Sequence, residues 1–186
     1  MKKLLLLVLL LSPWSVAAHG QENVPGPSKE PLAAMEQLKD MLGTWQMVTD
    51  YSPDNGKTWQ KSPPARSEFT LRQKGMMLVE TPLDTDQPGF HLETIFGYDQ
   101  YRDVYRLIAI DDYWGIVDLY EGTIEDNKLV VTNLKSGTFF PINETTSRAF
   151  QIAIDLTGDT RKMVIHKSDD GGKSWQPNFT ITYTKL

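Results

Sequence analysis

Cysteine is absent from this chain of 186 residues. The fold therefore contains no disulfide, and a lipid anchor attached through an N-terminal cysteine is excluded. Basic residues are also few, because 19 Lys and Arg stand against 24 Asp and Glu, and they form no basic stripe. We therefore expect neither a nucleic-acid partner nor binding to an anionic membrane.

The motifs of several common enzyme classes are missing as well. The chain has no Gly-x-Ser-x-Gly elbow, phosphate-binding loop, dinucleotide fingerprint or His-Glu-x-x-His helix. The usual supports of nucleophilic, nucleotide-dependent and zinc-protease chemistry are absent with them. The sequence thus favours a protein that is not an enzyme, without deciding the matter.

Long apolar runs are lacking too, and Leu4–Leu11, which follows Lys2 and Lys3, has only eight residues. This run is too short to span a bilayer and has the length of the apolar core of a secretory signal. Small residues before His19 predict a signal peptide over residues 1–18, cleaved after Ala18, with Ala17 and Gly20 as alternative sites. We therefore expect a periplasmic or secreted protein, whose formal charge moves from −5 to about −7 on cleavage.

The rest of the chain predicts a flexible leader over residues 19–31, where prolines gather, and one domain over residues 32–186. Leu32–Leu42 carries apolar residues at helical spacing and predicts one short helix, ended by Gly43. Beyond it, short runs rich in Val, Ile, Thr, Tyr and Phe alternate with Gly, Asp, Asn and Pro, as in antiparallel strands and turns.

We predict ten strands, over Thr44–Tyr51, Arg66–Gln73, Met76–Leu83, Phe90–Tyr98, Asp103–Asp111, Gly115–Ile124, Lys128–Leu134, Ser147–Leu156, Arg161–Ser168 and Trp175–Thr184. Ten hairpin-linked strands predict an all-β fold, a single up-and-down antiparallel barrel, because closure removes the exposed edges of a long meander. The N-terminal helix would then lie across one end.

A nine-residue phrase occurs twice, over residues 52–60 and 168–176, and both copies fit Ser-x-Asp-x-Gly-x-Ser/Thr-Trp. In such a turn the Asp accepts hydrogen bonds from N–H groups, the Gly takes a positive φ, and the Trp packs the turn onto the sheet. The predicted turn residues are Ser52, Asp54, Gly56 and Trp59 in the first copy and Ser168, Asp170, Gly172 and Trp175 in the second. Both copies resemble the Asp-box of bacterial sialidases and related β-propellers, a structural turn remote from the catalytic residues. No repeat of propeller-blade length accompanies them, so a sialidase is not predicted.

The order of the strands predicts where these turns lie. In a ten-stranded meander the turns after strands one and nine share one end, and closure brings them together. The connections Asp84–Gly89, Asp112–Trp114 and Gly137–Thr146 share that rim. They carry the aromatic residues that we predict as ligand-binding, unless they merely close loops: Tyr113, Trp114, Phe139 and Phe140.

The favoured function is binding of a small, partly apolar molecule within the barrel, reached through this rim. One alternative is a protein-interaction or envelope accessory module with a filled barrel, whose protein partner the sequence does not identify. Another is a hydrolase-type enzyme that uses inward carboxylates or His91.

No metal or other cofactor is predicted, although the histidines define two alternatives. Cleavage after Ala18 would place His19 at the N-terminus, where its amine and imidazole could bind copper together with His91 or His166. His91 and His166 lie among apolar neighbours on predicted strands, so either could instead ligate haem iron inside the barrel. A solvent-facing or hydrogen-bonded histidine is the simpler interpretation of each.

Four short motifs carry a family resemblance: Leu42–Trp45, Gly97–Asp99, Glu121–Gly122 and Ile181–Thr184. Over about Met35 to Lys185, the chain resembles a bacterial family of secreted proteins of unknown function, lipocalin-like in fold and belonging with the calycin barrels. The resemblance implies that Trp45 closes the barrel floor beside the N-terminal helix. It implies no catalytic residue, because the family has no established one, and the two repeated turns depart from typical members.

Overall fold

The computed structural model describes residues 26, 32–86 and 89–186. The predicted signal peptide, most of the predicted leader and His19 lie outside these residues. The described helices are α1 (Ala33–Glu36) and the 3₁₀ helices η1 (Lys39–Met41) and η2 (Gln73–Gly75). The strands are β1 (Gly43–Tyr51), β2 (Gln60–Lys61), β3 (Ala65–Arg72), β4 (Met77–Pro82), β5 (Leu92–Asp99), β6 (Val104–Asp111), β7 (Val117–Glu125), β8 (Lys128–Thr132), β9 (Phe140–Pro141), β10 (Ser147–Asp155), β11 (Thr160–Ser168) and β12 (Gln176–Lys185). No described helix is long and apolar enough to cross a membrane.

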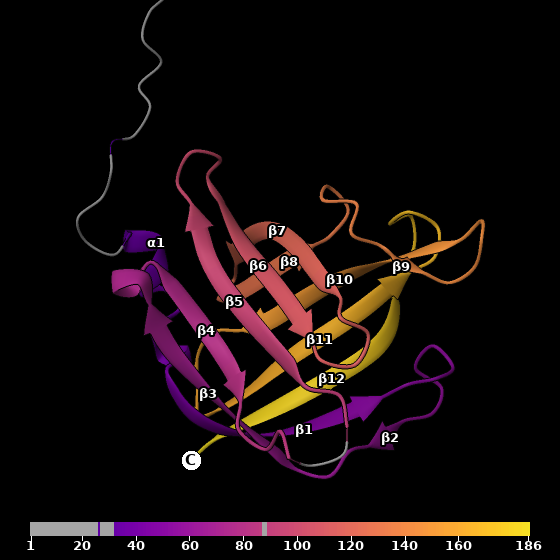
Figure 1. Cartoon of the computed structure of the whole chain (residues 1–186), viewed down its shortest axis with the longest axis horizontal. Coiled ribbons are helices and arrows are strands. Elements are labelled where there is room, and N and C mark those ends of the chain that lie inside the picture. The colour runs from indigo at the N-terminus through magenta and orange to yellow at the C-terminus, as the bar shows by residue number, and fades with distance from the viewer. Residues whose placement is uncertain (1–25, 27–31, 87–88) are drawn as a thin grey trace, which may run out of the picture.

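Ten of these strands close into one antiparallel barrel (Figure 1). They follow the order β1-β3-β4-β5-β6-β7-β8-β10-β11-β12, and β12 returns to pair with β1. The predicted all-β barrel of ten strands is therefore confirmed. The additional strands β2 and β9, which pair with β1 and β10, have two residues each and are too short to show an alternating pattern.

The inside of the barrel is packed with apolar side chains from all ten strands. One such residue from each strand, none more than 5% exposed, is Trp45, Phe69, Leu78, Phe96, Leu107, Tyr120, Leu129, Ile152, Met163 and Tyr183. A cavity of about 10 Å³ lies among Trp45, Phe69, Tyr183 and their neighbours. This volume holds about one water molecule.

The segment before β1 differs from the continuous helix predicted over Leu32–Leu42. It forms one α-helical turn and one 3₁₀ turn, in which the N–H groups of Leu38 and Met41 bond to the carbonyls three residues back. Met35, Leu38 and Met41 are at most 2% exposed. Their spacing of three matches the 3₁₀ period, so all three enter the same end of the barrel.

Trp45 fastens this segment to the barrel floor. Its indole N–H donates to the carbonyl of Met41 at 2.8 Å, and the guanidinium of Arg161 lies 4.5 Å from its ring centroid. Arg161 in turn donates to the carbonyl oxygens of Leu156 and Asp40. Trp45 thus occupies the position that the family resemblance implied.

Candidate functional site

The two repeated turns have the same internal hydrogen bonds. In the first, Gly56 N–H donates to Ser52 Oγ at 2.6 Å and Thr58 N–H to Asp54 Oδ1 at 2.7 Å. The matching bonds in the second turn, at 2.8 and 3.0 Å, run from Gly172 to Ser168 and from Ser174 to Asp170. Gly56 and Gly172 have φ values of +88° and +86°. The Ser and Asp side chains and the positive φ values thus act in the same way in both turns.

Both turns lie at one rim of the barrel, at the end away from α1 (Figure 1). Ser52 N–H donates to the carbonyl of Asn178 at 2.8 Å, and Gly56 lies against Pro177 at the start of β12. The indoles differ, because Trp175 is half-buried while Trp59 is 44% exposed. Trp59 therefore does not pack its turn closely in the predicted way, since it precedes β2, an edge strand of only two residues.

Three aromatic residues gather around Trp114 at the same rim. Its ring centroid lies 4.7 Å from that of Tyr113, 5.5 Å from Phe90 and 6.0 Å from Phe140. The exposed fraction is 68% for Tyr113, 59% for Trp114 and 49% for Phe90. We call Phe90, Tyr113, Trp114 and Phe140 the aromatic rim. The fourth predicted residue, Phe139, is half-buried and takes no part in these ring contacts among the described residues.

A buried carboxylate holds the loop that carries Tyr113 and Trp114. Asp111 is only 8% exposed, and its two oxygens accept hydrogen bonds from four successive N–H groups, those of Tyr113, Trp114, Gly115 and Ile116. These bonds fix the backbone of the loop while its two rings stay exposed. Asp111 was not among the predicted site residues, although an Asp directly before an aromatic turn is a pattern that can reveal such an anchor.

His91 joins this loop to the segment that carries Phe90. Its Nδ1 lies 2.7 Å from Asp112 Oδ2, and its N–H donates to Asp112 Oδ1 at 2.9 Å. Both bonds hold the pKa of Asp112 below its usual value. His91 therefore lies at the rim against a carboxylate, which differs from the haem-ligating position inside the barrel.

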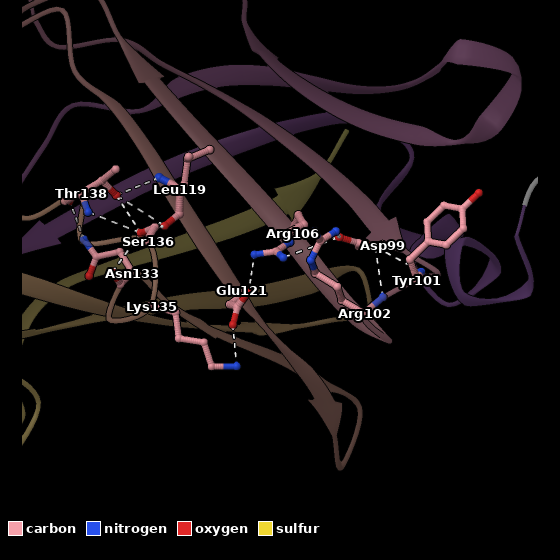
Figure 2. Close-up of polar contacts among 10 residues, drawn as sticks. All are labelled: Asp99, Tyr101, Arg102, Arg106, Leu119, Glu121, Asn133, Lys135, Ser136 and Thr138. Carbon is pink, nitrogen blue, oxygen red and sulfur yellow. Dashed lines mark hydrogen bonds and ion pairs between the residues drawn. The ribbon is translucent and has the colours of Figure 1, made fainter. Parts of the chain in front are cut away.

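The segment that leads to Phe139 and Phe140 is anchored along β7 (Figure 2). Ser136 Oγ donates to the carbonyl of Leu119 at 2.5 Å, and Leu119 N–H donates to Thr138 Oγ1 at 3.1 Å. Asn133, which is fully buried, donates to the carbonyl of Thr138 at 2.9 Å. Beyond the end of β8, side chains of the loop thus bond to the backbone N–H and C=O groups of Leu119 in β7. These bonds hold the loop that leads to the aromatic rim.

A row of ion pairs on the outer wall reinforces this anchor (Figure 2). Arg106 on β6 lies 3.6 Å from Asp99 on β5 and pairs with Glu121 on β7. Lys135 then reaches Glu121 at 2.6 Å from the loop after β8. Lys135 and Arg106 lower the pKa of Glu121. The ion pairs thus connect the loop after β8 with β5, β6 and β7.

The side chains of two further acidic residues point into the barrel and accept hydrogen bonds from neighbouring hydroxyl groups. Glu80 is 4% exposed and accepts a hydrogen bond from Thr94 at 2.8 Å. Asp118 accepts one from the Tyr120 hydroxyl at 3.0 Å. Burial raises the pKa of both carboxyl groups.

His166 does not face the barrel interior as the haem alternative required. It stands opposite Gln151 in β10, between residues of β10 that face the core, so strand alternation along this continuous register places His166 on the outer face. Its Nδ1 is buried there and has no hydrogen-bond partner among the described residues. Among the described residues, no group of three or more His, Cys, Asp or Glu could hold a metal ion. His19, the first residue of the proposed copper site, lies outside them.

A second hollow, of about 240 Å³, lies beside α1 at the opposite end. The hydroxyls that line it have partners, because Tyr98 bonds to Asp103 and Tyr105 donates to the carbonyl of Ala34 at 2.8 Å. The bond to Asp103 and burial raise the pKa of Tyr98 to about 12. The exposed, prearranged rings make the aromatic rim the stronger candidate for a binding site.

Sequence comparison places the whole barrel within one family. The family described as "Protein of unknown function (DUF1579)" matches residues 30–185. The chain belongs to this family. No curated protein gives a significant match. The matched span of the DUF1579 domain includes every strand of the barrel and all four residues of the aromatic rim.

Proposed function

We propose that this DUF1579 domain is a non-enzymatic binding protein that holds a small, partly apolar molecule on its aromatic rim. The observation that carries this proposal is Trp114, which is 59% exposed although three other rings surround it and Asp111 fixes its loop. Exposed apolar clusters of this kind mark binding surfaces. A loop that is already ordered loses little conformational entropy when a ligand binds.

The size of the described cavity favours the rim over the barrel interior. Pockets for small molecules usually have volumes of about 300–1,000 Å³, whereas the cavity beside Trp45 has about 10 Å³. The faces and edges of Trp114 and Tyr113 suit an aromatic or sugar-like ring, which aromatic side chains stack against. We therefore place the ligand on the rim rather than in the core.

A protein-interaction module is the second candidate. On β7, directly after the Trp114 loop, Val117 is 54% exposed and Leu119 is 43% exposed. These side chains extend the apolar surface of the aromatic rim along the outer wall, and such continuous surfaces favour a protein partner.

We also propose that the domain acts in the periplasm or outside the cell, on the strength of the signal-like residues 1–18.

Substitution of Trp114 tests the proposed site. We expect Trp114→Ala to weaken binding of the uncharged fluorescent probe N-phenyl-1-naphthylamine about tenfold, because a packed aromatic ring contributes on the order of 1 kcal/mol or more. The affinity is measured by fluorescence titration of the purified chain.

The matched control is Trp59→Ala, which removes an exposed indole from a different loop of the same rim. This variant is expected to bind the probe as the unchanged chain does. Equal affinities for the Trp114→Ala and Trp59→Ala variants would show that the aromatic rim is not the binding site.

A further inference from the structure

Lys167, near the end of β11, has a largely buried side chain on the inner side of the rim. The residue is only 7% exposed. It stands opposite Phe150 on β10 and two residues after Ile165, both of which pack against the core. Strand alternation therefore directs Lys167 to the interior side of the sheet, at the rim that carries the two repeated turns.

Lys167 shares its nearest counter-charge, the Asp169 carboxylate, with Arg148. Arg148, on the neighbouring strand, is bound through two nitrogens to Asp169 at 2.7 and 2.9 Å, which raises the pKa of its guanidinium. Among the described residues, Lys167 makes no ion pair within 4 Å and no side-chain hydrogen bond. Burial and the nearby Arg148 lower the pKa of Lys167, while Asp169 raises it. Two cations thus share one carboxylate.

Lys167 lies close to the aromatic rim through β10. Phe140 pairs with Arg148 on one edge of β10, and Lys167 pairs with Phe150 on the other edge, two residues further along. Strand geometry places the Cα atoms of Phe140 and Lys167 roughly 12 Å apart. One small molecule can therefore reach both the aromatic rim and the ammonium group.

We propose that the ligand of the aromatic rim carries an anionic group, such as a carboxylate, phosphate or sulfonate, which Lys167 binds. This inference rests on the proposed function and narrows its ligand to an amphipathic organic anion. The ammonium of Lys167 is not among the side-chain atoms that are buried without a partner, so an anion can approach it from the rim. The buried stem limits the hydration of this group, which favours an anionic partner. Arg148 is held by Asp169, so Lys167 supplies the free charge.

Two probes with the same aromatic skeleton test the inference. They are 8-anilinonaphthalene-1-sulfonate, which is anionic, and N-phenyl-1-naphthylamine, which lacks the sulfonate. We expect the purified full chain to bind the anionic probe about tenfold more tightly, the effect of one charge-assisted hydrogen bond. Lys167→Met is expected to remove this preference and to leave the affinity for the uncharged probe unchanged.

Two further variants control for folding and for general charge. Lys167→Arg keeps the cation and is expected to retain the preference for the anionic probe. Lys162→Met removes an exposed lysine of the same strand, five residues earlier and on its outer face, and is expected to change neither affinity. Thermal unfolding of each variant shows whether the barrel is intact.

The outcomes separate this inference from the proposed function. Equal affinities of the unchanged chain for the two probes, or a Lys167→Met variant that keeps the preference, would overturn the anion site. Loss of both affinities in a folded Lys167→Met variant would also overturn it, because the effect would not depend on the sulfonate. Weaker binding of both probes by Trp114→Ala supports the aromatic rim whichever result Lys167 gives.

Discussion

Buried ionisable side chains of this barrel have three different surroundings. Asp111 is surrounded by N–H donors, and Lys167 shares the Asp169 carboxylate with Arg148. Glu80 lies deep in the core among hydroxyls, of which that of Thr94 donates to it at 2.8 Å. The environment of Glu80 favours its neutral form, since burial raises the pKa of its carboxyl group. Its charge therefore opposes folding.

Replacing Glu80 by glutamine makes this effect measurable. Because its pKa is higher in the folded chain than in the unfolded chain, the protein loses stability as pH rises above the usual range of a glutamate. Glu80→Gln does not ionise, so we expect it to be more stable than the unchanged chain near pH 8, by about 1–3 kcal/mol. The difference should shrink below pH 4, as measured by urea unfolding across pH.

Glu93→Gln is the matched control, because Glu93 neighbours the buried Thr94 and so lies on the outer face of β5. This variant is expected to follow the pH dependence of the unchanged chain. Parallel pH curves for Glu80→Gln and the unchanged chain would contradict the argument. The sequence did not predict the burial of Glu80, since a charged residue on a barrel strand usually faces water.

At the scale of elements, the strands were more predictable than the first helix. Alternation such as Phe150, Ile152 and Ile154 in β10 identifies a strand wherever one face is buried. The apolar spacing over Leu32–Leu42 fits both helix types, and only contact with the barrel end separates them. That contact buries Met35, Leu38 and Met41, and thereby selects a 3₁₀ turn.

Gly122 in β7 provides a prediction for the sheet itself. A Cβ atom at this position would lie 1.9 Å from the carbonyl oxygen of Val130 in the adjacent strand. A clash with backbone cannot be relieved by a change of rotamer, so the two strands would have to separate. We expect Gly122→Ala to destabilise the barrel by about 3 kcal/mol or more, measured by urea unfolding.

Gly97→Ala in β5 is the matched control, because there the nearest atom to an added Cβ, the carbonyl oxygen of Met76, lies 3.9 Å away. This variant should unfold within about 1 kcal/mol of the unchanged chain. If the two alanine variants were equally stable, the close approach at Gly122 would be wrong.

For the whole molecule, counting strands was enough to place the two repeated turns on one rim. The contacts between the first turn and Pro177 and Asn178 confirm that placement. The same strand count also predicted that the loop of Tyr113 and Trp114 lies at the same rim as Phe140. It could not show Phe90 or Lys167 at the site, because their positions depend on how loop ends and side chains pack.

The intact mass of the protein isolated from cells tests its proposed maturation and ligand together. We expect a chain that begins at His19, found in the periplasm or the medium, because Leu4–Leu11 has the features of a cleaved signal. Under native conditions, a bound organic anion would support the aromatic rim and Lys167. A chain that keeps residues 1–18 would contradict the proposed export, and a bound copper ion would revive the site at His19.

Barrel closure has a consequence for how the chain folds. β12 pairs with β11 on one side and with β1 on the other, where Trp45 stands opposite Lys185. Contacts between residues so distant in sequence form slowly, because a long loop must first be ordered. Until residues 176–185 have been synthesised, the nascent chain presents two open strand edges, at β1 and β11, that can pair with other chains. Pairing of β12 with β1 and β11 thus covers both open edges and removes the sites at which the chain could aggregate.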